Sequence, residues 1–114
     1  MHDLAKTFQA LSDTNRIRIL KMLEIRPLCV CEITEILNLA NSTVSKHLSL
    51  LRDSGFIIDD KEGRWVNYRL INHADNEYVT NLLTLLSSWL PDDSIIKQDQ
   101  RRVTEVDRNI ICGN

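Results

Sequence analysis

The spacing of apolar positions along the chain predicts a mainly helical protein. Apolar residues recur every three or four positions within residues 3–12, again after Asp13, and again within residues 30–38. Ser12-Asp13-Thr14 offers capping oxygens for the second of these helices. Pro27 ends that helix, because proline cannot continue a helix interior.

A fourth helical pattern covers residues 42–54, after a short break at Leu39-Ala40-Asn41. Its apolar positions are Val44, Leu48 and Leu51, while hydroxyl and charged side chains lie on the opposite face. Gly55 follows it, as glycine often does after a helix. Two short helices joined by about three residues, the second with a polar outer face, indicate a helix-turn-helix.

A β-hairpin is predicted next in the sequence. Phe56-Ile57-Ile58 leads into a turn at Asp60-Lys61-Glu62-Gly63. The returning strand runs from Arg64 to Leu70, and Val66, Tyr68 and Leu70 alternate toward one side. The expected fold class is therefore mainly α with a small β-hairpin.

The last third of the chain predicts one more long helix and a tail. Residues 75–90 have a broad apolar face, and Pro91 ends the helix. An amphipathic segment follows, with Ile96, Val103, Val106 and Ile110 at helical spacing. We divide the chain into a domain at 1–90 and a C-terminal tail at 91–114, which ends near Cys112.

Composition and charge exclude several classes of protein. The chain has 114 residues, and 43% are hydrophobic, as in globular domains. No apolar run is long enough to cross a membrane, and the N-terminus lacks a signal-peptide layout, so we expect a cytoplasmic protein with no membrane partner. No phosphate-binding loop, zinc-protease motif or supported catalytic triad occurs, so we expect no enzyme.

The net charge of −2 conceals an uneven distribution. Residues 1–71 have one more basic than acidic residue, whereas residues 72–114 have three more acidic than basic residues. DNA binding requires a local basic face rather than a basic whole. We predict DNA contacts from the fourth helix and the hairpin tip: Asn41, Ser42, Thr43, Ser45, Lys46, His47, Ser49, Arg52, Lys61 and Arg64.

Residues 28–70 resemble the core of a known family. Ser45-Lys46-His47-Leu48, Leu51-Arg52-Asp53-Ser54-Gly55 and the run from Gly63 to Leu70 match patterns of the ArsR/SmtB metal-responsive repressors. The resemblance implies a winged helix-turn-helix homodimer, built from the first helix and the long helix after the wing. It also implies a repressor of double-stranded operator DNA that requires no cofactor to bind. Ala40 replaces the family's usual serine N-cap, so Asn41 or Ser42 is expected to cap instead.

Cys29 and Cys31 open the third helix within a segment that resembles the family's effector box. A helix N-terminus should lower the pKa of both thiols, and thiolates bind soft ions. Residues i and i+2 of a regular helix do not face each other, so both sulfurs can reach one ion only if this start is partly non-helical. We hypothesise that an inducer bound here shifts the neighbouring helix at residues 42–54, the recognition helix, and lowers the affinity for DNA.

The remaining ligands are less well specified by the sequence. Thr34 occupies the position of a third cysteine in one type of arsenic-responsive member, and Cys112 is the only other cysteine. A set of Cys29, Cys31 and Cys112, from one subunit or two, favours trivalent arsenic or antimony as inducer. A ligand from His2 would favour cadmium or zinc instead.

Two further alternatives concern the kind of signal. The family's oxygen and nitrogen zinc site is not matched. His73 and Asp75 lie near the start of the long helix, but no histidine or carboxylate follows them within residues 79–90. Repressors on the same scaffold that sense cadmium, lead or zinc, and repressors whose cysteines oxidise, stay open at this point.

Overall fold

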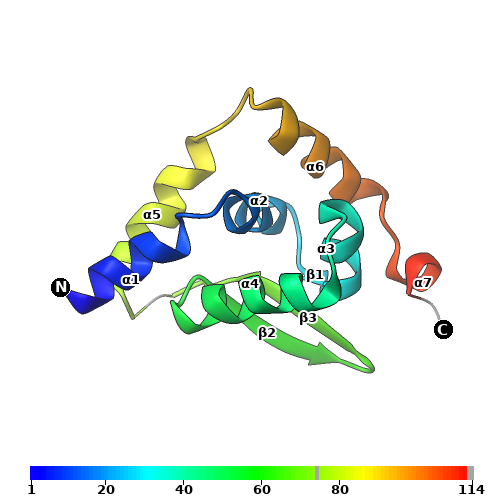
Figure 1. The fold of residues 1–114 in the computed structure, drawn as a ribbon, viewed down its shortest axis with the longest axis horizontal. Coiled ribbons are helices and arrows are strands. Elements are labelled where there is room, and N and C mark those ends of the chain that lie inside the picture. Colours follow the sequence, from blue (N-terminus) through cyan, green and yellow to red (C-terminus); the bar gives the residue numbers. More distant parts are fainter. Residues whose placement is uncertain (74, 113–114) are drawn as a thin grey trace.

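The computed structural model describes residues 1–73 and 75–112, and it confirms the mainly helical prediction. Its elements, drawn in Figure 1, follow one another as α1 His2–Ala10, α2 Thr14–Leu23, β1 Leu28–Cys29, α3 Val30–Leu37, α4 Asn41–Asp53, β2 Ile57–Glu62, β3 Trp65–Leu70, α5 Glu77–Ser88, α6 Ser94–Glu105 and α7 Arg108–Ile111. Within the described part of the chain, no helix has the length and apolarity needed to cross a membrane.

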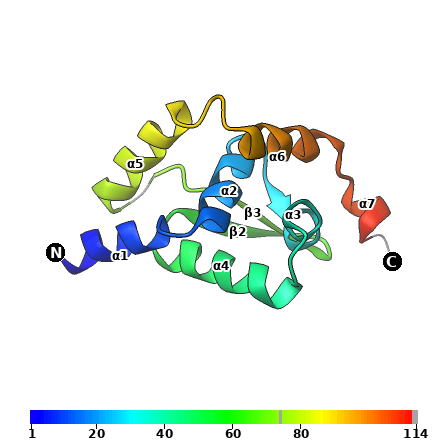
Figure 2. The same ribbon diagram turned by 45° about the horizontal axis from the view of Figure 1, so that its top comes forward.

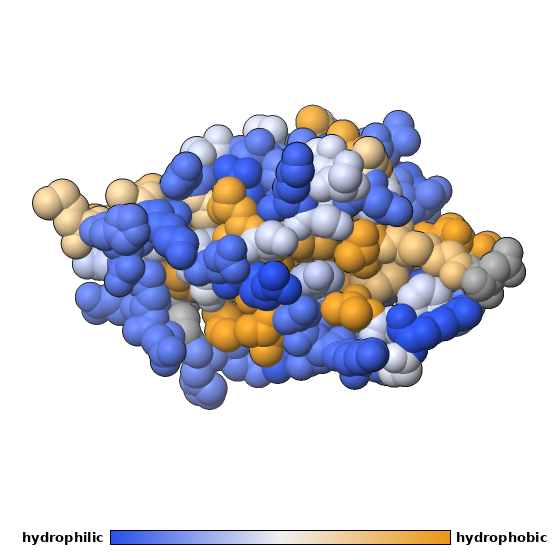
Figure 3. Space-filling view, turned by 60° about the horizontal axis from the view of Figure 1, so that its bottom comes forward, coloured by the Kyte–Doolittle hydropathy of each residue, from blue (hydrophilic) through white to orange (hydrophobic). Residues whose placement is uncertain are grey.

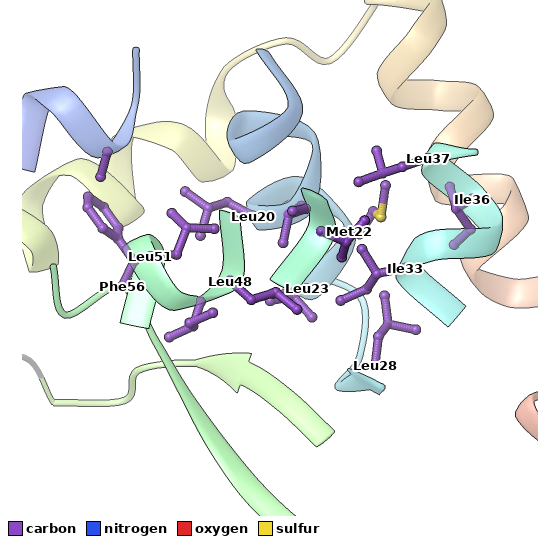
Figure 4. Close-up of a cluster of buried hydrophobic side chains, with 14 of the residues drawn as sticks. Leu20, Met22, Leu23, Leu28, Ile33, Ile36, Leu37, Leu48, Leu51 and Phe56 are labelled. Carbon is purple, nitrogen blue, oxygen red and sulfur yellow. The ribbon is translucent and has the colours of Figure 1, made fainter. Parts of the chain in front are cut away.

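The core lies between α2, α3 and α4. Figure 4 shows Leu48 and Leu51 of α4 facing Leu20 and Leu23 of α2, with Ile33 of α3 beside them. These side chains are almost completely buried. Burial of each large apolar side chain contributes about 2 kcal/mol, so packing rather than helix propensity fixes the angle between α3 and α4.

The sheet has one strand more than the sequence predicts. β2 and β3 form the expected antiparallel hairpin, and β1 pairs with the other edge of β3, giving the order β1-β3-β2. In this added ladder Leu28 pairs with Tyr68, and Cys29 pairs with Asn67. A two-residue strand carries no periodicity that a sequence pattern could reveal.

Three local predictions need correction. The hairpin turn lies at Gly63 and Arg64 rather than at residues 60–63, because Glu62 already pairs with Trp65 and Gly63 adopts a φ of +59°. Val66 is exposed rather than turned inward, since it lies next to the hairpin tip and beyond the core.

The start of α4 also differs from the prediction. Ala40 is the N-cap residue and makes no side-chain hydrogen bond, so neither Asn41 nor Ser42 caps the helix. Asn38 ends α3 in the left-handed region, with a φ of 55°, and this reverses the chain within the short break. The helix-turn-helix is therefore closed by backbone conformation and packing.

The C-terminal third wraps over the domain. α5 lies beside α1, and α6 crosses α2 and α3 (Figures 1 and 2). Arg18 of α2 donates two hydrogen bonds to the carboxylate of Asp99 of α6, at 2.8 and 2.9 Å. The buried amine of Lys21 donates to the carbonyl oxygens of Leu86 and Trp89, which fixes the end of α5.

The tail is not one continuous amphipathic helix. Ile96 and Val103, on the inner face of α6, are buried as expected. However, α6 ends at Glu105, and Ile110 of α7 is 80% exposed. The helical spacing of Val106 and Ile110 therefore does not reflect a common buried face. The proposed boundary at residue 90 stays a prediction.

The N-cap of α2 provides a stability test with a defined pH dependence. The side chain of Asp13 accepts hydrogen bonds from the backbone N–H groups of Asn15 and Arg16. Burial favours the neutral acid, but these hydrogen bonds outweigh it and hold the pKa of Asp13 below its usual value of 3.8. Asp13→Ala should lower the free energy of unfolding by about 1 kcal/mol, as measured by urea denaturation at pH 7.

The sign of the pH effect follows from the lowered pKa. Stabilisation by the Asp13 carboxylate is complete above the unfolded pKa and is lost as the pH falls through the lower folded pKa. The difference between the wild type and Asp13→Ala should therefore narrow at acid pH. Asp92→Ala, at an exposed aspartate outside the cap, is the control. A gap that did not change with pH would contradict this role.

Candidate functional site

The outer face of α4 is exposed and polar. The predicted DNA contacts on this helix, except His47, are all exposed: Asn41, Ser42, Thr43, Ser45, Lys46, Ser49 and Arg52. Val44, Leu48 and Leu51 are buried on the opposite side, as the pattern predicts. Figure 3 views the molecule from the hairpin side and shows a largely hydrophilic surface with separate apolar patches. The small hydroxyl side chains of α4 leave room for close approach to a groove.

Several of the predicted contacts already have partners within the chain, His47 and Arg52 among them. His47 is half-buried, and its Nδ1 lies 3.3 Å from Nη1 of Arg16 in α2. A guanidinium can only donate, so Nδ1 accepts and the contact ties α4 to α2. Arg52 pairs with Asp59 of β2 at 3.3 Å across two exposed side chains. Such an exposed pair contributes little stability, so Arg52 can exchange Asp59 for a phosphate at small cost.

The hairpin of β2 and β3 is the wing of the fold, and its acidic residues are all paired with arginines. Asp59 pairs with Arg52 of α4, Asp60 with Arg69 of β3, and Glu62 with Arg108 of α7. The acids that would repel DNA are therefore locally neutralised. Lys61 and Arg64 lie exposed at the tip, and the guanidinium of Arg64 lies 4.5 Å from the centre of the Trp65 ring.

Cys29 is both the last residue of β1 and the N-cap of α3. Its backbone is extended, with φ −87° and ψ 168°, so the start of α3 is non-helical at this cysteine, as two-sulfur ligation requires. Its backbone N–H donates to Oε1 of Glu32 at 3.0 Å, which is half of a reciprocal capping box. The thiol itself is free and buried.

The predicted lowering of the thiol pKa values is wrong for Cys29. Burial raises the pKa of this thiol above its usual value, and the neighbouring Glu32 carboxylate raises it further. Hydrogen bonds from the backbone of Glu32 and Cys31 act in the expected direction but are outweighed. A helix N-terminus lowers the pKa of a thiol only where burial and adjacent negative charge do not outweigh it, as they do at Cys29.

Glu32 connects the cysteine segment to the C-terminal part of the chain. Its buried carboxylate accepts a hydrogen bond from Nη2 of Arg26 at 2.9 Å. Arg26 also donates to the carbonyl oxygens of Val103 and Val106, at the end of α6. Although burial favours the neutral acid, the hydrogen bonds from Cys29 and Arg26 hold the pKa of Glu32 below its ordinary value. The ion pair of Arg26 and Glu32 thus connects the start of α3 to the C-terminal end of α6.

Cys112 reaches Cys31 within one chain. The two residues form a disulfide with Cα atoms 6.2 Å apart, although 81 positions separate them in the sequence. Cys31 therefore has no thiol to titrate, and the predicted pKa lowering does not apply to it. Among residues 1–73 and 75–112, no group of three histidine, cysteine or acidic side chains is arranged as a metal site. The structure brings two of the three predicted sulfurs together, those of Cys31 and Cys112. Cys29, two positions before Cys31 in the sequence, takes no part in the bond.

The cysteine segment is in contact with the recognition helix through α3. α3 packs directly against α4. Thr34 donates to the carbonyl oxygen of Val30 at 2.7 Å, and its Oγ1 lies 3.0 Å from Oδ1 of Asn41, the first residue of α4. Thr34, which replaces a cysteine at this position, therefore lies between the start of α3 and the start of α4.

Sequence reasoning missed the contacts of the tail with the wing. Arg108 of α7 touches Glu62, Trp65 and Asn67, and no local pattern relates residues more than 40 positions apart. The signal available in the sequence was an outward-facing Trp65, since an exposed large aromatic side chain on a strand often has a partner.

Further exposed apolar side chains lie on α1, on α5, in the turn after α5 and at the start of α6. Large apolar side chains there remain open to solvent in the single chain: Phe8, Leu85, Trp89, Leu90 and Ile95. Asn76, the N-cap of α5, donates to the buried hydroxyl of Thr7 in α1 at 3.2 Å. The start of α5 is therefore attached to α1, so the two helices are neighbours.

Comparison with known proteins gives a consistent result. The family described as "Bacterial regulatory protein, arsR family" matches residues 13–59. The arsenical resistance operon repressor of Escherichia coli K12 is 43% identical over 94% of this chain and 84% of its own length. A homologue of the cadmium resistance regulatory protein CadC from Staphylococcus aureus is 40% identical over 71% of this chain and 64% of its own length.

The solved structures agree with the fold. The homodimeric winged helix-turn-helix DNA-binding domain Mb0332 from Mycobacterium bovis superposes with a TM-score of 0.63 at 26% identity, over 75% of this chain and 76% of that one. The predicted winged helix fold is therefore confirmed.

Proposed function

This chain belongs to the ArsR family of bacterial regulatory proteins, and on that premise we propose that it is a repressor released from operator DNA by trivalent arsenic or antimony. The observation that carries the proposal is the meeting of Cys31 and Cys112 in one chain, with Cys29 two positions before Cys31 in the sequence. In the reduced protein these three sulfurs form the only cysteine set that the sequence offers, and soft ions select thiolates.

The donor set fits trivalent arsenic better than a four-coordinate metal. Arsenite would take three sulfur ligands here, and its three hydroxyl groups would leave as water with the three thiol protons. α1, which begins at His2, lies at the opposite end of the molecule from α7 and Cys112 (Figures 1 and 2). Within one chain, His2 is therefore too remote to supply the fourth ligand that cadmium or zinc prefers.

Two routes connect the sulfurs to the DNA-binding elements. The first runs through α3 to α4, by packing and by Thr34 beside Asn41. The second runs through β1, because Cys29 pairs with Asn67 of the wing strand β3. A change of backbone at Cys29 therefore acts on both elements at once, and a coupling of about 1–3 kcal/mol would lower operator affinity by about 5- to 150-fold.

A second candidate function is a thiol redox response, which the Cys31–Cys112 disulfide favours. Peroxide would take two electrons from the two thiols, and their protons would leave with it as two molecules of water. This response needs Cys31 and Cys112 but not Cys29, whereas the arsenic site needs all three.

Cysteine variants separate the two candidates. Cys31→Ser and Cys112→Ser should lose the response of operator binding to both arsenite and peroxide, measured by fluorescence anisotropy of labelled operator DNA. Cys29→Ser should lose the arsenite response and keep the peroxide response. Serine is itself a good N-cap, so this variant should keep the start of α3 intact.

The control for this experiment is operator affinity in the reduced protein without inducer, which should stay within about twofold of wild type because no cysteine lies on the DNA-binding face. Full arsenite release in Cys112→Ser would contradict the three-sulfur site. A wild type indifferent to arsenite but responsive to peroxide would favour the redox function.

We propose that Lys46, exposed on α4, contacts a backbone phosphate of the operator. Lys46→Gln should weaken binding on all sequences and reduce the slope of log affinity against log salt by about one per subunit. Lys97→Gln on α6 removes the same charge from a side chain that is 55% exposed, and should leave the slope unchanged. Equal slopes in wild type and Lys46→Gln would exclude the phosphate contact.

We also propose a homodimer through α1 and α5, because these two neighbouring helices carry exposed apolar side chains that a second copy would cover. Leu85 is 47% exposed, so Leu85→Lys should not unfold the chain but should produce a monomer in sedimentation experiments. Thr80→Lys, on another exposed side of the same helix, should remain dimeric. A dimeric Leu85→Lys protein would place the interface elsewhere.

A further inference from the structure

The short helix α7 touches the wing through a single side chain. Arg108 pairs with the carboxylate of Glu62, donates to Oδ1 of Asn67 at 2.8 Å, and lies 5.0 Å from the centre of the Trp65 ring. Asn67 donates in turn to the other oxygen of Glu62 at 3.1 Å. These contacts form a closed network on the outward face of the hairpin.

α7 also lies against α3, but no buried side chain anchors it there. Its two isoleucines, Ile110 and Ile111, are 80% and 38% exposed. A helix of four residues is not stable alone in water. Its docked position therefore depends on Arg108 at one end and on the bond from Cys112 to Cys31 at the other.

Arg108 and Cys112 are rigidly related to each other. The backbone N–H of Cys112 donates to the carbonyl oxygen of Arg108 at 2.9 Å, which closes one turn of helix between them. Whatever fixes the sulfur of Cys112 against α3 thus also fixes the guanidinium of Arg108 over the hairpin. Figures 1 and 2 show α7 and the hairpin tip at the same end of the molecule.

We propose that residues 107–112 act as a latch, in which Arg108 is the positioning residue that transmits the state of Cys112 to the wing. When Cys112 is joined to Cys31, directly or through a shared inducer, Arg108 holds the hairpin against the tail. When Cys112 is free, α7 detaches and the hairpin can adjust to the DNA backbone. The inducer arm of this proposal rests on the proposed function.

The contacts at Trp65 explain why the latch acts on DNA binding. The same ring carries Arg64, one of the predicted wing contacts, 4.5 Å from its centre. With Arg108 in place, two guanidinium groups share one ring, and Glu62 is paired beside them. Loss of Arg108 changes the charge and the freedom of the wing tip without any change in the core or in α4.

The latch can be observed directly in the indole N–H signal of Trp65 in nitrogen–proton NMR spectra, assigned with the help of Trp89→Phe. In the wild type, this signal should differ between the dithiol-reduced and the disulfide-linked protein, because Arg108 leaves the ring. In Arg108→Gln the two states should give the same shift. Arg101→Gln, at an exposed arginine on α6, should behave like wild type. A Trp65 signal that is the same in the reduced and the disulfide-linked wild type overturns the latch.

Operator binding tests the functional consequence. Arg108→Gln and Glu62→Gln should bind the operator within about twofold of wild type when reduced, and arsenite should then weaken their binding at least about threefold less than it weakens that of wild type, because only the two routes through Cys29 remain. Arg101→Gln should keep the full arsenite effect. A full effect in Arg108→Gln overturns the latch while leaving the arsenic site intact. If arsenite has no effect on the wild type, the proposed function fails, and the NMR comparison decides on the latch alone.

Discussion

The rest of the structure depends on the abrupt change from strand to helix at Cys29. This residue ends β1, pairs with Asn67 in the wing, caps α3 and donates its backbone N–H to the buried Glu32. Backbone groups in such a position must all be satisfied at once, because an unpaired buried N–H costs about 1–3 kcal/mol. The wing, the helix-turn-helix and the cysteine segment consequently share one fixed point, and none of them can move there independently.

The network around Glu32 extends this fixed point to the C-terminal third. Arg26 binds Glu32 and also the carbonyl oxygens at the end of α6, while Arg18 binds Asp99 on the same helix. The middle of α6 is therefore attached to α2 through Arg18, and its C-terminal end is attached to the segment after α2 through Arg26, although the sequence places α6 in a tail. This attachment directs the last residues past the wing and brings Cys112 back to Cys31.

Residue patterns predicted the elements whose stability is local or periodic. Helical spacing located α1 to α5 within a few residues, and the polar face of α4 followed from three buried positions, Val44, Leu48 and Leu51. Patterns failed where a contact joins distant segments, as for β1 on β3 and Arg108 on Trp65. The cysteine count placed Cys112 near Cys31, but as ligands of one ion and not as a disulfide. The raised pKa of Cys29 belongs with these failures, since burial by the assembled domain outweighs the local effect of the helix start.

The bond between Cys31 and Cys112 encloses almost the whole winged helix, because 81 positions lie between its ends. A cross-link over so long a loop removes much of the conformational entropy of the unfolded chain, by about 4–5 kcal/mol in a simple chain-entropy estimate. Chemistry at these two sulfurs thus governs the lifetime of the folded protein as well as its conformation. In a cell where these two thiols are oxidised to the disulfide, the protein should therefore be more resistant to proteolysis.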